Sequence, residues 1–255
     1  MTPTDYESPA ILHQYLLFHY GSERDQFGSW PAPAPADYPG RCAQAALQRF
    51  GPGRSQRALD VGCAVGGSTF ALAREIPTVL GLDLSETFIR AANQLKAEGR
   101  AQVERVGEGD LTTTLEVQVA PAIDRSRVTF QVGDACALPS LGLKPFDLVL
   151  AANLIDRLPK PRAFLTALPS LIADGGLLAL MSPYTWLETF TPKAEWLGGR
   201  ETFGRRIETL AGLKFFLSPH FELIDRCDLP FAIREHARKF QWSMAEATFW
   251  RRKVA

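Results

Sequence analysis

The sequence predicts an α/β fold with a mostly parallel sheet and helices on both faces. Strand-like apolar runs alternate with helical runs along residues 57–182, which is typical of a parallel sheet. The run at 146–154 is continuously apolar, as expected of a strand buried on both faces. A run at 240–250 follows its predecessor closely enough to pair with it as an antiparallel hairpin.

The composition indicates one domain over residues 1–255. Of the 255 residues, 46% are hydrophobic, which is enough for a full core. Lys and Arg number 28, as do Asp and Glu, so no nucleic-acid or membrane-surface partner is indicated. The start lacks the basic flank and apolar core of a signal peptide, and no apolar run reaches the length of a membrane span. The four cysteines are scattered along the chain. We expect a cytoplasmic protein with reduced thiols and no metal site.

The N-terminal segment 1–40 is expected to cap a binding site. Ser8 and Pro9 are typical of a helix start, and the helix should run to residue 20. It could pack on the core or form a lid, and both interpretations stay open. Residues 30–39 are proline-rich and predict a stiff connector before a helix at 41–50.

The remaining elements follow from apolar periodicity and from turn residues. A polar insertion at 100–126 should form a hairpin that includes a strand near 112–119, and Asp174-Gly175-Gly176 should end a helix. The predicted strands are 57–61, 79–83, 128–132, 146–154, 177–182, 221–225 and 240–250, and the predicted helices after the first strand include 68–74, 86–99 and 204–216.

The turn after the first strand is rich in glycine. Gly62, Gly66 and Gly67 permit a sharp turn and a close approach of a ligand to the backbone, and Ala64 is a small departure from a Gly-x-Gly-x-Gly pattern. The helix at 68–74 presents its N-terminal amides to the same place. This unit is typical of a nucleoside-binding site at the carboxyl ends of parallel strands.

Carboxylates accompany both strands of this unit. Asp60 lies at the end of the first strand, and Asp83 ends the second, where an acid can accept two ribose hydroxyls. The glycines would also suit a dinucleotide, but Asp60 would repel a pyrophosphate. S-adenosylmethionine (SAM) carries an ammonium and a sulfonium group and no phosphate, so we expect SAM. A purely structural unit is the alternative.

The stretch 57–85 resembles the first two motifs of the class I SAM-dependent methyltransferases. Across essentially the whole chain, further segments resemble the 4-mercaptohistidine ring-nitrogen methyltransferases of ovothiol biosynthesis. In many organisms this domain follows the sulfoxide synthase that couples cysteine to histidine, and here it would stand alone. The segments that carry the resemblance are YLLFHYG at 15–21, GCAVGG at 62–67, SPYTWLE at 182–188, FTPK at 190–193, WLGG at 196–199 and PFAIREH at 230–236.

This resemblance implies a Rossmann-like class I fold, namely a seven-stranded, mostly parallel sheet with an antiparallel last strand. Residues 41–182 would form the nucleoside-binding half, and 183–255 the substrate-side insertion and C-terminal hairpin. The enzyme would methylate a ring nitrogen of 4-mercaptohistidine (5-thiohistidine) to give ovothiol, with S-adenosylhomocysteine as the second product and no metal. Functional coupling to the sulfoxide synthase is expected.

The expected site residues fall into three groups, and each also has a plain structural interpretation. Arg41 would pair with the methionine carboxylate of SAM, Asp134 would accept from the adenine amino group, and Arg234 would hold the substrate carboxylate. The cofactor-binding residues would be Arg41, Asp60, Gly62, Cys63, Ala64, Gly66, Asp83, Leu84, Asp134, Ala135 and Asn153. The catalytic residues would be Asn153, His19 and Tyr20. The substrate-binding residues would be Tyr15, Tyr184, Trp186, Arg234 and His236.

Three other functions remain open at this stage. The enzyme could methylate another small amino acid or imidazole metabolite. The protein could be a non-catalytic SAM-binding partner of the sulfoxide synthase. An NAD-dependent oxidoreductase is less favoured, because Asp60 would repel the pyrophosphate of NAD.

Overall fold

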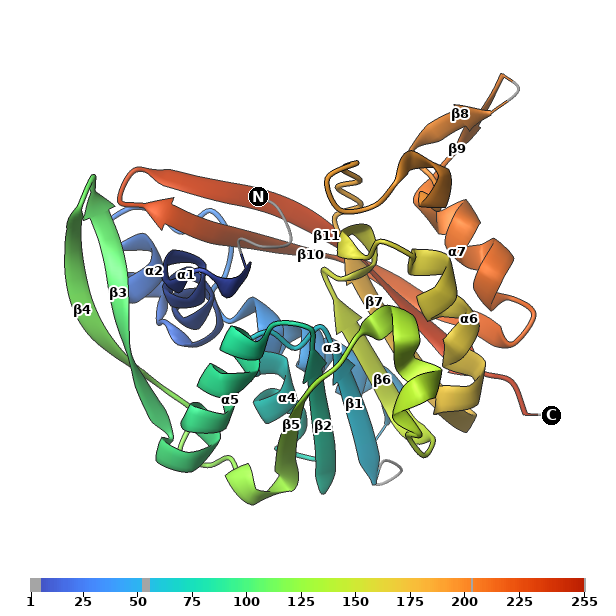
Figure 1. The fold of residues 1–255 in the computed structure, drawn as a ribbon, viewed down its shortest axis with the longest axis horizontal. Coiled ribbons are helices and arrows are strands. Elements are labelled where there is room, and N and C mark those ends of the chain that lie inside the picture. Colours follow the sequence, from blue (N-terminus) through green and yellow to red (C-terminus); the bar gives the residue numbers. More distant parts are fainter. Residues whose placement is uncertain (1–5, 52–55, 203, 255) are drawn as a thin grey trace.

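The core of the fold is a seven-stranded sheet in the order β10-β11-β7-β6-β1-β2-β5 (Figure 1). The computed structural model describes residues 6–51, 56–202 and 204–254. The first five residues of the expected cap segment 1–40 therefore lie outside the described residues. β11 is antiparallel to both of its neighbours, and the other pairs are parallel, which confirms the predicted sheet. The strands are β1 (Arg57–Val61), β2 (Thr78–Asp83), β5 (Val128–Val132), β6 (Phe146–Ala152), β7 (Ile172–Ser182), β10 (Phe221–His236) and β11 (Lys239–Arg252).

Helices cover both faces of the sheet because alternate residues of the central strands point to opposite sides. Leu148 and Leu150 of β6 join the apolar cluster that includes α1, α3, α4 and α5, whereas Val149 and Ala151 join the cluster that includes α6 and α7. The helices are α1 (Pro9–Tyr20), α2 (Glu23–Phe27), α3 (Tyr38–Phe50), α4 (Gly67–Leu72), α5 (Glu86–Glu98), α6 (Pro161–Leu171) and α7 (Thr209–Leu217).

The predicted N-terminal helix is confirmed. The Ser8 side chain accepts from the Ile11 backbone N–H, and Pro9 occupies the first turn. The stiff connector, however, is shorter than predicted. The Asp37 carboxylate caps the next helix by accepting from the Gly40 N–H, so Tyr38 belongs to the first turn of α3.

The insertion hairpin is confirmed, as β3 (Arg100–Glu108) and β4 (Leu111–Gln118) form a separate two-stranded sheet. Two predicted boundaries are wrong. Helix α7 begins at residue 209, because β8 (Arg200–Thr202) and β9 (Arg205–Ile207) form a small hairpin before it. Gly175 does not cap a helix but lies within β7, at a register irregularity against β6.

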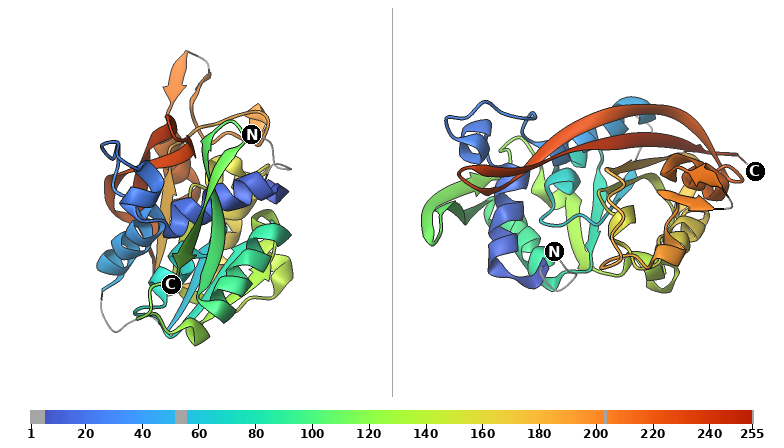
Figure 2. Two further views of the ribbon diagram at one scale, coloured as in Figure 1. Left: turned by 90° about the vertical axis from the view of Figure 1, so that its left-hand side faces the viewer. Right: turned by 90° about the horizontal axis from the view of Figure 1, so that it is seen from above.

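The C-terminal hairpin is much longer than predicted. Residues 246–251 of β11 pair with β7, while the rest of the hairpin continues beyond the sheet and lies over α1 and β3 (Figure 2). There the Gln14 side chain on α1 donates to the Arg234 carbonyl at 2.7 Å. Of the described helices, none is long and apolar enough to cross a membrane.

The chain order reverses between β1 and β6. The chain proceeds from β1 to β2 and β5 on one side, and then returns to β6 and β7 on the other. Ligands of open α/β sheets bind in the crevice beyond the carboxyl ends of the strands at such a point. The site should therefore lie above the ends of β1 and β6.

Candidate active site

A cavity of about 330 Å³ lies at the carboxyl ends of the parallel strands, under α1. Its walls combine aromatic rings with a few polar groups, as is typical of small-molecule sites. The aromatic residues are Tyr6, Tyr15, Phe18, Tyr38, Phe88 and Phe190, and the polar or charged residues are Glu7, His19, Ser68, Asp83, Ser85, Asp134, Asn153 and Arg157. Of the predicted site residues, it contains Tyr15, His19, Gly62, Ala64, Asp83, Leu84, Asp134, Ala135 and Asn153.

The glycine turn forms the floor of the cavity. Gly62 has φ of +74°, and a Cβ added there would lie 2.8 Å from Cδ1 of Leu154, so a side chain would strain the backbone and clash. Ala64 also has positive φ, at 47°, and its N–H donates to Oδ2 of Asp83 at 2.8 Å. The turn is thus held tightly between Leu154 and Asp83.

Asp83 and Leu84 form the end of the cavity that suits a nucleoside. The two carboxylate oxygens of Asp83 accept from the backbone N–H groups of Ala64 and Ser85, and burial raises the pKa of this carboxyl. Leu84 is 67% exposed although it is apolar and lines the cavity. A ribose on Asp83 and an adenine over Leu84 would use both features.

Asp134 lies at the same end and lines the cavity. Its Oδ1 accepts from the Cys136 backbone N–H at 2.7 Å, which fixes the carboxylate at the start of the 3₁₀ segment Ala135–Leu141. Glu7, which the sequence interpretation missed, also lines this end, and it accepts from the Thr87 N–H at 3.2 Å. Both acids are placed where a cationic ligand such as SAM would be stabilised.

Asp60 does not line the cavity, which corrects its expected contact with the cofactor. Its side chain is 1% exposed, and Oδ2 accepts from the Ser68 hydroxyl at 2.6 Å and the Thr69 hydroxyl at 2.7 Å. Burial raises the pKa of Asp60 to about 6, against the lowering effect of these hydrogen bonds. Asp60 therefore ties the start of α4 to β1 from beneath the turn.

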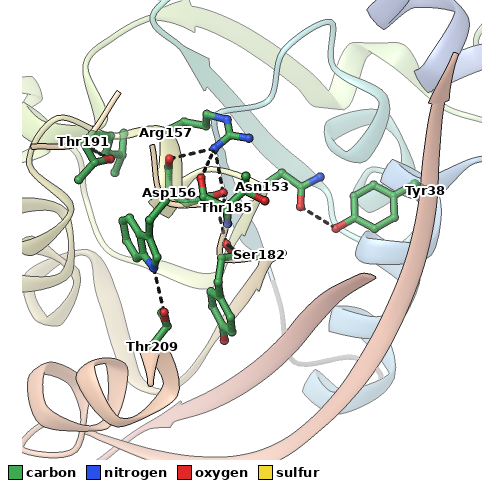
Figure 3. Close-up of polar contacts among 11 residues, drawn as sticks. Tyr38, Asn153, Asp156, Arg157, Ser182, Thr185, Thr191 and Thr209 are labelled. Carbon is green, nitrogen blue, oxygen red and sulfur yellow. Dashed lines mark hydrogen bonds and ion pairs between the residues drawn. The ribbon is translucent and has the colours of Figure 1, made fainter. Parts of the chain in front are cut away.

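Asn153 lies directly after β6 and enters the cavity with a left-handed backbone, φ 53°. Its Oδ1 accepts from the Tyr38 hydroxyl at 3.0 Å (Figure 3). This bond fixes the carboxamide orientation and leaves its NH₂ as the donor. The sequence places Tyr38 in the predicted connector, and no sequence pattern indicated that this residue would reach the cavity.

His19 lines the cavity as a neutral donor and not as a base. Its Nδ1 accepts from the Gly67 backbone N–H at 3.1 Å, so the proton of the neutral ring is on Nε2. Burial lowers the pKa of His19 to about 3. Its neighbour Tyr20 does not line the cavity, because its hydroxyl donates to the Val65 carbonyl at 2.6 Å. Together these bonds fasten α1 to the glycine turn.

Three further expected cofactor residues, besides Asp60, lie outside the cavity lining. Cys63 is buried behind the turn, and Gly66 caps α4, where a Cβ would meet the Phe130 ring at 2.6 Å. Arg41 donates from Nε to the Ala36 carbonyl at 3.2 Å and from Nη2 to the Pro230 carbonyl at 2.6 Å. The guanidinium thus holds the connector against β10 and lies away from the cavity lining, where the expected contact with the cofactor would be made.

Tyr184 and Trp186 do not wall the cavity, contrary to expectation. The Tyr184 hydroxyl donates to Oε2 of Glu246 at 2.7 Å, and the Trp186 indole N–H donates to the Thr209 hydroxyl at 2.9 Å. Both rings pack in the apolar cluster on the α6 and α7 face of the sheet.

Arg234 and His236 also lie elsewhere, because β10 carries them past the sheet. Nη1 and Nη2 of Arg234 each donate at 3.0 Å to backbone carbonyls, those of Gln26 and Val106, and burial lowers the pKa of this arginine. Nδ1 of His236 accepts from the Arg238 N–H at the hairpin tip. Arg234 therefore does not line this cavity, where it was expected to hold the substrate carboxylate.

The sequence interpretation missed Arg157, which enters the cavity from the 3₁₀ turn Ile155–Arg157 after β6. Nη1 donates to Oδ2 of Asp156 at 2.9 Å and to the Thr185 carbonyl at 2.9 Å (Figure 3). A signal was present, since this Asp-Arg pair directly follows an apolar strand at its carboxyl end.

Known proteins are similar to the central part of the chain. Residues 59–178 match the family described as a methyltransferase domain. The chain is also similar to a ubiquinone biosynthesis O-methyltransferase of Caulobacter sp. (strain K31), with 31% identity over 140 residues, or 53% of this chain and 46% of that protein. The chain spans less than half the length of the curated relatives it matches.

Solved structures share the fold of this chain. The N-methyltransferase NodS from Bradyrhizobium japonicum WM9, in complex with S-adenosylhomocysteine, has a TM-score of 0.53 at 13% identity and covers 93% of this chain and 100% of its own. Magnesium protoporphyrin IX methyltransferase from Synechocystis PCC 6803, with bound SAM, has a TM-score of 0.52 at 16% identity and covers 85% of this chain and 80% of its own. Together, the matched domain and the shared fold support an enzyme of the SAM-dependent methyltransferase class.

Proposed function

We propose that this protein is a SAM-dependent N-methyltransferase that acts on a ring nitrogen of 4-mercaptohistidine (5-thiohistidine) and yields ovothiol. Two observations support the proposal. The peripheral segments resemble the enzymes of this reaction, and the acceptor end of the cavity presents hydrogen-bond donors without a histidine base. The second observation carries the argument.

The residues at the nucleoside end fit SAM. Asp83 would accept the ribose hydroxyls and Leu84 would cover one face of the adenine, while the Gly62 turn lines the cavity beside them. When bound, SAM supplies an electrophilic methyl group, and its sulfur keeps the electron pair of the broken bond. The acidic residues at this end favour the cationic cofactor over its neutral product.

Apart from Arg157, the acceptor end is lined by neutral donors. His19 presents Nε2–H, because Nδ1 is occupied by the Gly67 amide, and Asn153 presents its NH₂, because Oδ1 is occupied by Tyr38. Burial holds the pKa of Tyr15 well above its usual value, so this hydroxyl stays protonated. Such a wall stabilises an anion and cannot readily remove a proton.

A mercaptoimidazole suits this wall. The substrate carries its negative charge on a thiolate, which the donors can hold aside, and its unprotonated ring nitrogen already has a lone pair for the methyl group. After transfer, the proton stays on the other ring nitrogen, so no base is required in that step. Orientation then decides between nitrogen and sulfur, and positioning of this kind can supply roughly 7–11 kcal/mol.

Two other substrates are consistent with the same fold. Another small amino acid or imidazole could occupy the acceptor end. The similarity to ubiquinone biosynthesis O-methyltransferases favours a phenolic hydroxyl, which would need a group to take its proton. A non-catalytic SAM-binding partner of the sulfoxide synthase would bind SAM but methylate none of these compounds.

The test is a substrate panel. Purified protein is incubated with SAM and, separately, with 5-thiohistidine, histidine or a catechol, and methyl gain is measured by mass spectrometry. The proposal predicts methyl gain on 5-thiohistidine alone. Methylation of the catechol in preference to 5-thiohistidine would contradict it, and SAM binding without any turnover would favour the non-catalytic partner.

A further inference from the structure

Arg157 stands out among the cavity residues. Of the described residues that line the cavity, it is the one arginine or lysine, since Arg41 and Arg234 lie elsewhere and His19 is neutral. Its side chain is 26% exposed, which leaves part of the guanidinium open to the cavity. A cation at this place attracts an anionic group of a bound molecule.

The guanidinium is held rigidly from behind. Asp156 is 0% exposed, and its Oδ1 accepts from the Ser182 hydroxyl at 3.0 Å while Oδ2 accepts from the Thr185 N–H at 3.0 Å and from Nη1 of Arg157 at 2.9 Å. The bonds that Arg157 donates to Oδ2 and the carbonyl of Asp156 and to the Thr185 carbonyl all come from Nη1. Figure 3 shows the other nitrogens directed away from Asp156.

Aromatic side chains complete the surroundings of Arg157. Its guanidinium carbon lies 5.0 Å from the centre of the Phe190 ring, a distance at which a cation is attracted to the ring face. The Tyr6 ring lies 6.0 Å from the Tyr15 ring, centre to centre, and the nearby Arg157 guanidinium acts to lower the pKa of Tyr6 against the effect of burial. Burial raises the pKa of both tyrosines, which keeps them protonated.

We propose that Arg157, with the hydroxyls of Tyr6 and Tyr15, forms the subsite that binds the α-carboxylate of the methyl acceptor. A planar guanidinium that retains free donors binds a carboxylate through paired hydrogen bonds. The proposal rests on the proposed function for the identity of the acceptor. It also makes Asp156 a positioning residue, which acts on the substrate only through Arg157.

The experiment compares two acceptors and two variants. The acceptors are 5-thiohistidine and 5-thiohistamine, which lacks the carboxylate. The variants are Arg157→Gln and, as a matched control, Arg226→Gln, since Arg226 lies on the surface against Glu246. The wild type and the control should prefer 5-thiohistidine in kcat/KM. Arg157→Gln should lower kcat/KM for 5-thiohistidine by about 10-fold to 150-fold and leave that for 5-thiohistamine nearly unchanged.

The affinity for SAM provides the second readout. If Arg157 binds the acceptor, Arg157→Gln should leave the Kd of SAM unchanged. Weaker SAM binding in this variant, or a preference for 5-thiohistidine that persists in it, would overturn the subsite. Arg157→Lys retains the charge without the paired geometry and should recover only part of the preference.

Failure of the proposed function can be distinguished from failure of the subsite. If the wild type methylates neither thiol, the proposed function is wrong. Calorimetric titration of the S-adenosylhomocysteine complex with a panel of α-amino acids and their decarboxylated amines then decides the subsite. Carboxylate-dependent binding that disappears in Arg157→Gln supports it, and the absence of such binding in the wild type overturns it.

Discussion

The Tyr38 hydroxyl donates to Oδ1 of Asn153 at 3.0 Å and so joins the first turn of α3 to the end of β6. The bond crosses the reversal point of the sheet, where the reacting groups must meet. The bond fixes the orientation of the Asn153 carboxamide, so that its NH₂ group remains as a donor. The donor that Asn153 presents to the cavity therefore depends on Tyr38.

Tyr38→Phe should lower kcat by about 2-fold to 10-fold, because loss of one neutral hydrogen bond lets the Asn153 amide rotate. The affinity for SAM and the melting temperature should change little. Tyr184→Phe is the matched control, since that hydroxyl donates to Glu246 outside the cavity lining. Steady-state kinetics of both variants check the prediction, and equal effects in the two would contradict it.

Asp83→Ala should weaken SAM binding by about tenfold or more, because each charge-assisted hydrogen bond to a ribose hydroxyl contributes roughly 1.5–3 kcal/mol. The Ala64 and Ser85 amides would also lose their acceptor, so the variant should melt at a lower temperature. Calorimetric titration with SAM measures the affinity. Unchanged SAM affinity in the folded variant would remove Asp83 from the cofactor site.

Gly62→Ala should destabilise the protein by about 1–3 kcal/mol and abolish tight SAM binding, because the new methyl group meets both positive φ and Leu154. Gly142→Ala separates the two causes. Gly142 also has positive φ, at 59°, but an added Cβ would have nothing within 4 Å. Urea unfolding should show the larger loss for Gly62→Ala, and equal losses would mean that contact with Leu154 contributes nothing.

Asp60 makes the stability depend on pH. Its pKa in the folded protein is about 6, above the ordinary value of 3.8, so the folded state holds its proton more tightly. The associated stability is fully present below about pH 4 and is lost as the pH rises to about 6, by roughly 3 kcal/mol. Wild type should therefore lose stability relative to Asp60→Asn over this range.

Urea unfolding of both proteins at several pH values measures this difference. Asp225→Asn is the control, because pairing with Arg49 lowers the pKa of Asp225 and gives the opposite sign. A constant difference between wild type and Asp60→Asn across the range would contradict the raised pKa, because it would mean that Asp60 has the same pKa in the folded and unfolded states.

Local pattern was sufficient to predict much of the fold and the cofactor end. Alternating apolar runs and a glycine turn specify the βαβ unit within a short stretch, so Gly62 and Asp83 could be placed from sequence. Asp60 was misplaced because sequence gives the end of a strand but not the face on which its last residues lie. Its side chain turns beneath the loop to Ser68 and Thr69.

The acceptor end depends on contacts between distant parts of the chain. Arg234 could not be placed from sequence, because β10 continues past the sheet and carries it away from the strand ends. Tyr38 reaches the cavity because Asp37 starts α3 earlier than the prolines suggest. Arg157 was the one missed residue with a local signal, an Asp-Arg pair at the end of an apolar strand.

The most direct test of the account follows a single methyl group. SAM labelled with ¹³C in the methyl group is incubated with the enzyme and 5-thiohistidine, and the product is examined by NMR. The account predicts that the label appears as an N-methyl on the imidazole ring, with the sulfur left free. A label on sulfur would contradict the proposed orientation of the thiolate, and no transfer to 5-thiohistidine would contradict the proposed function itself.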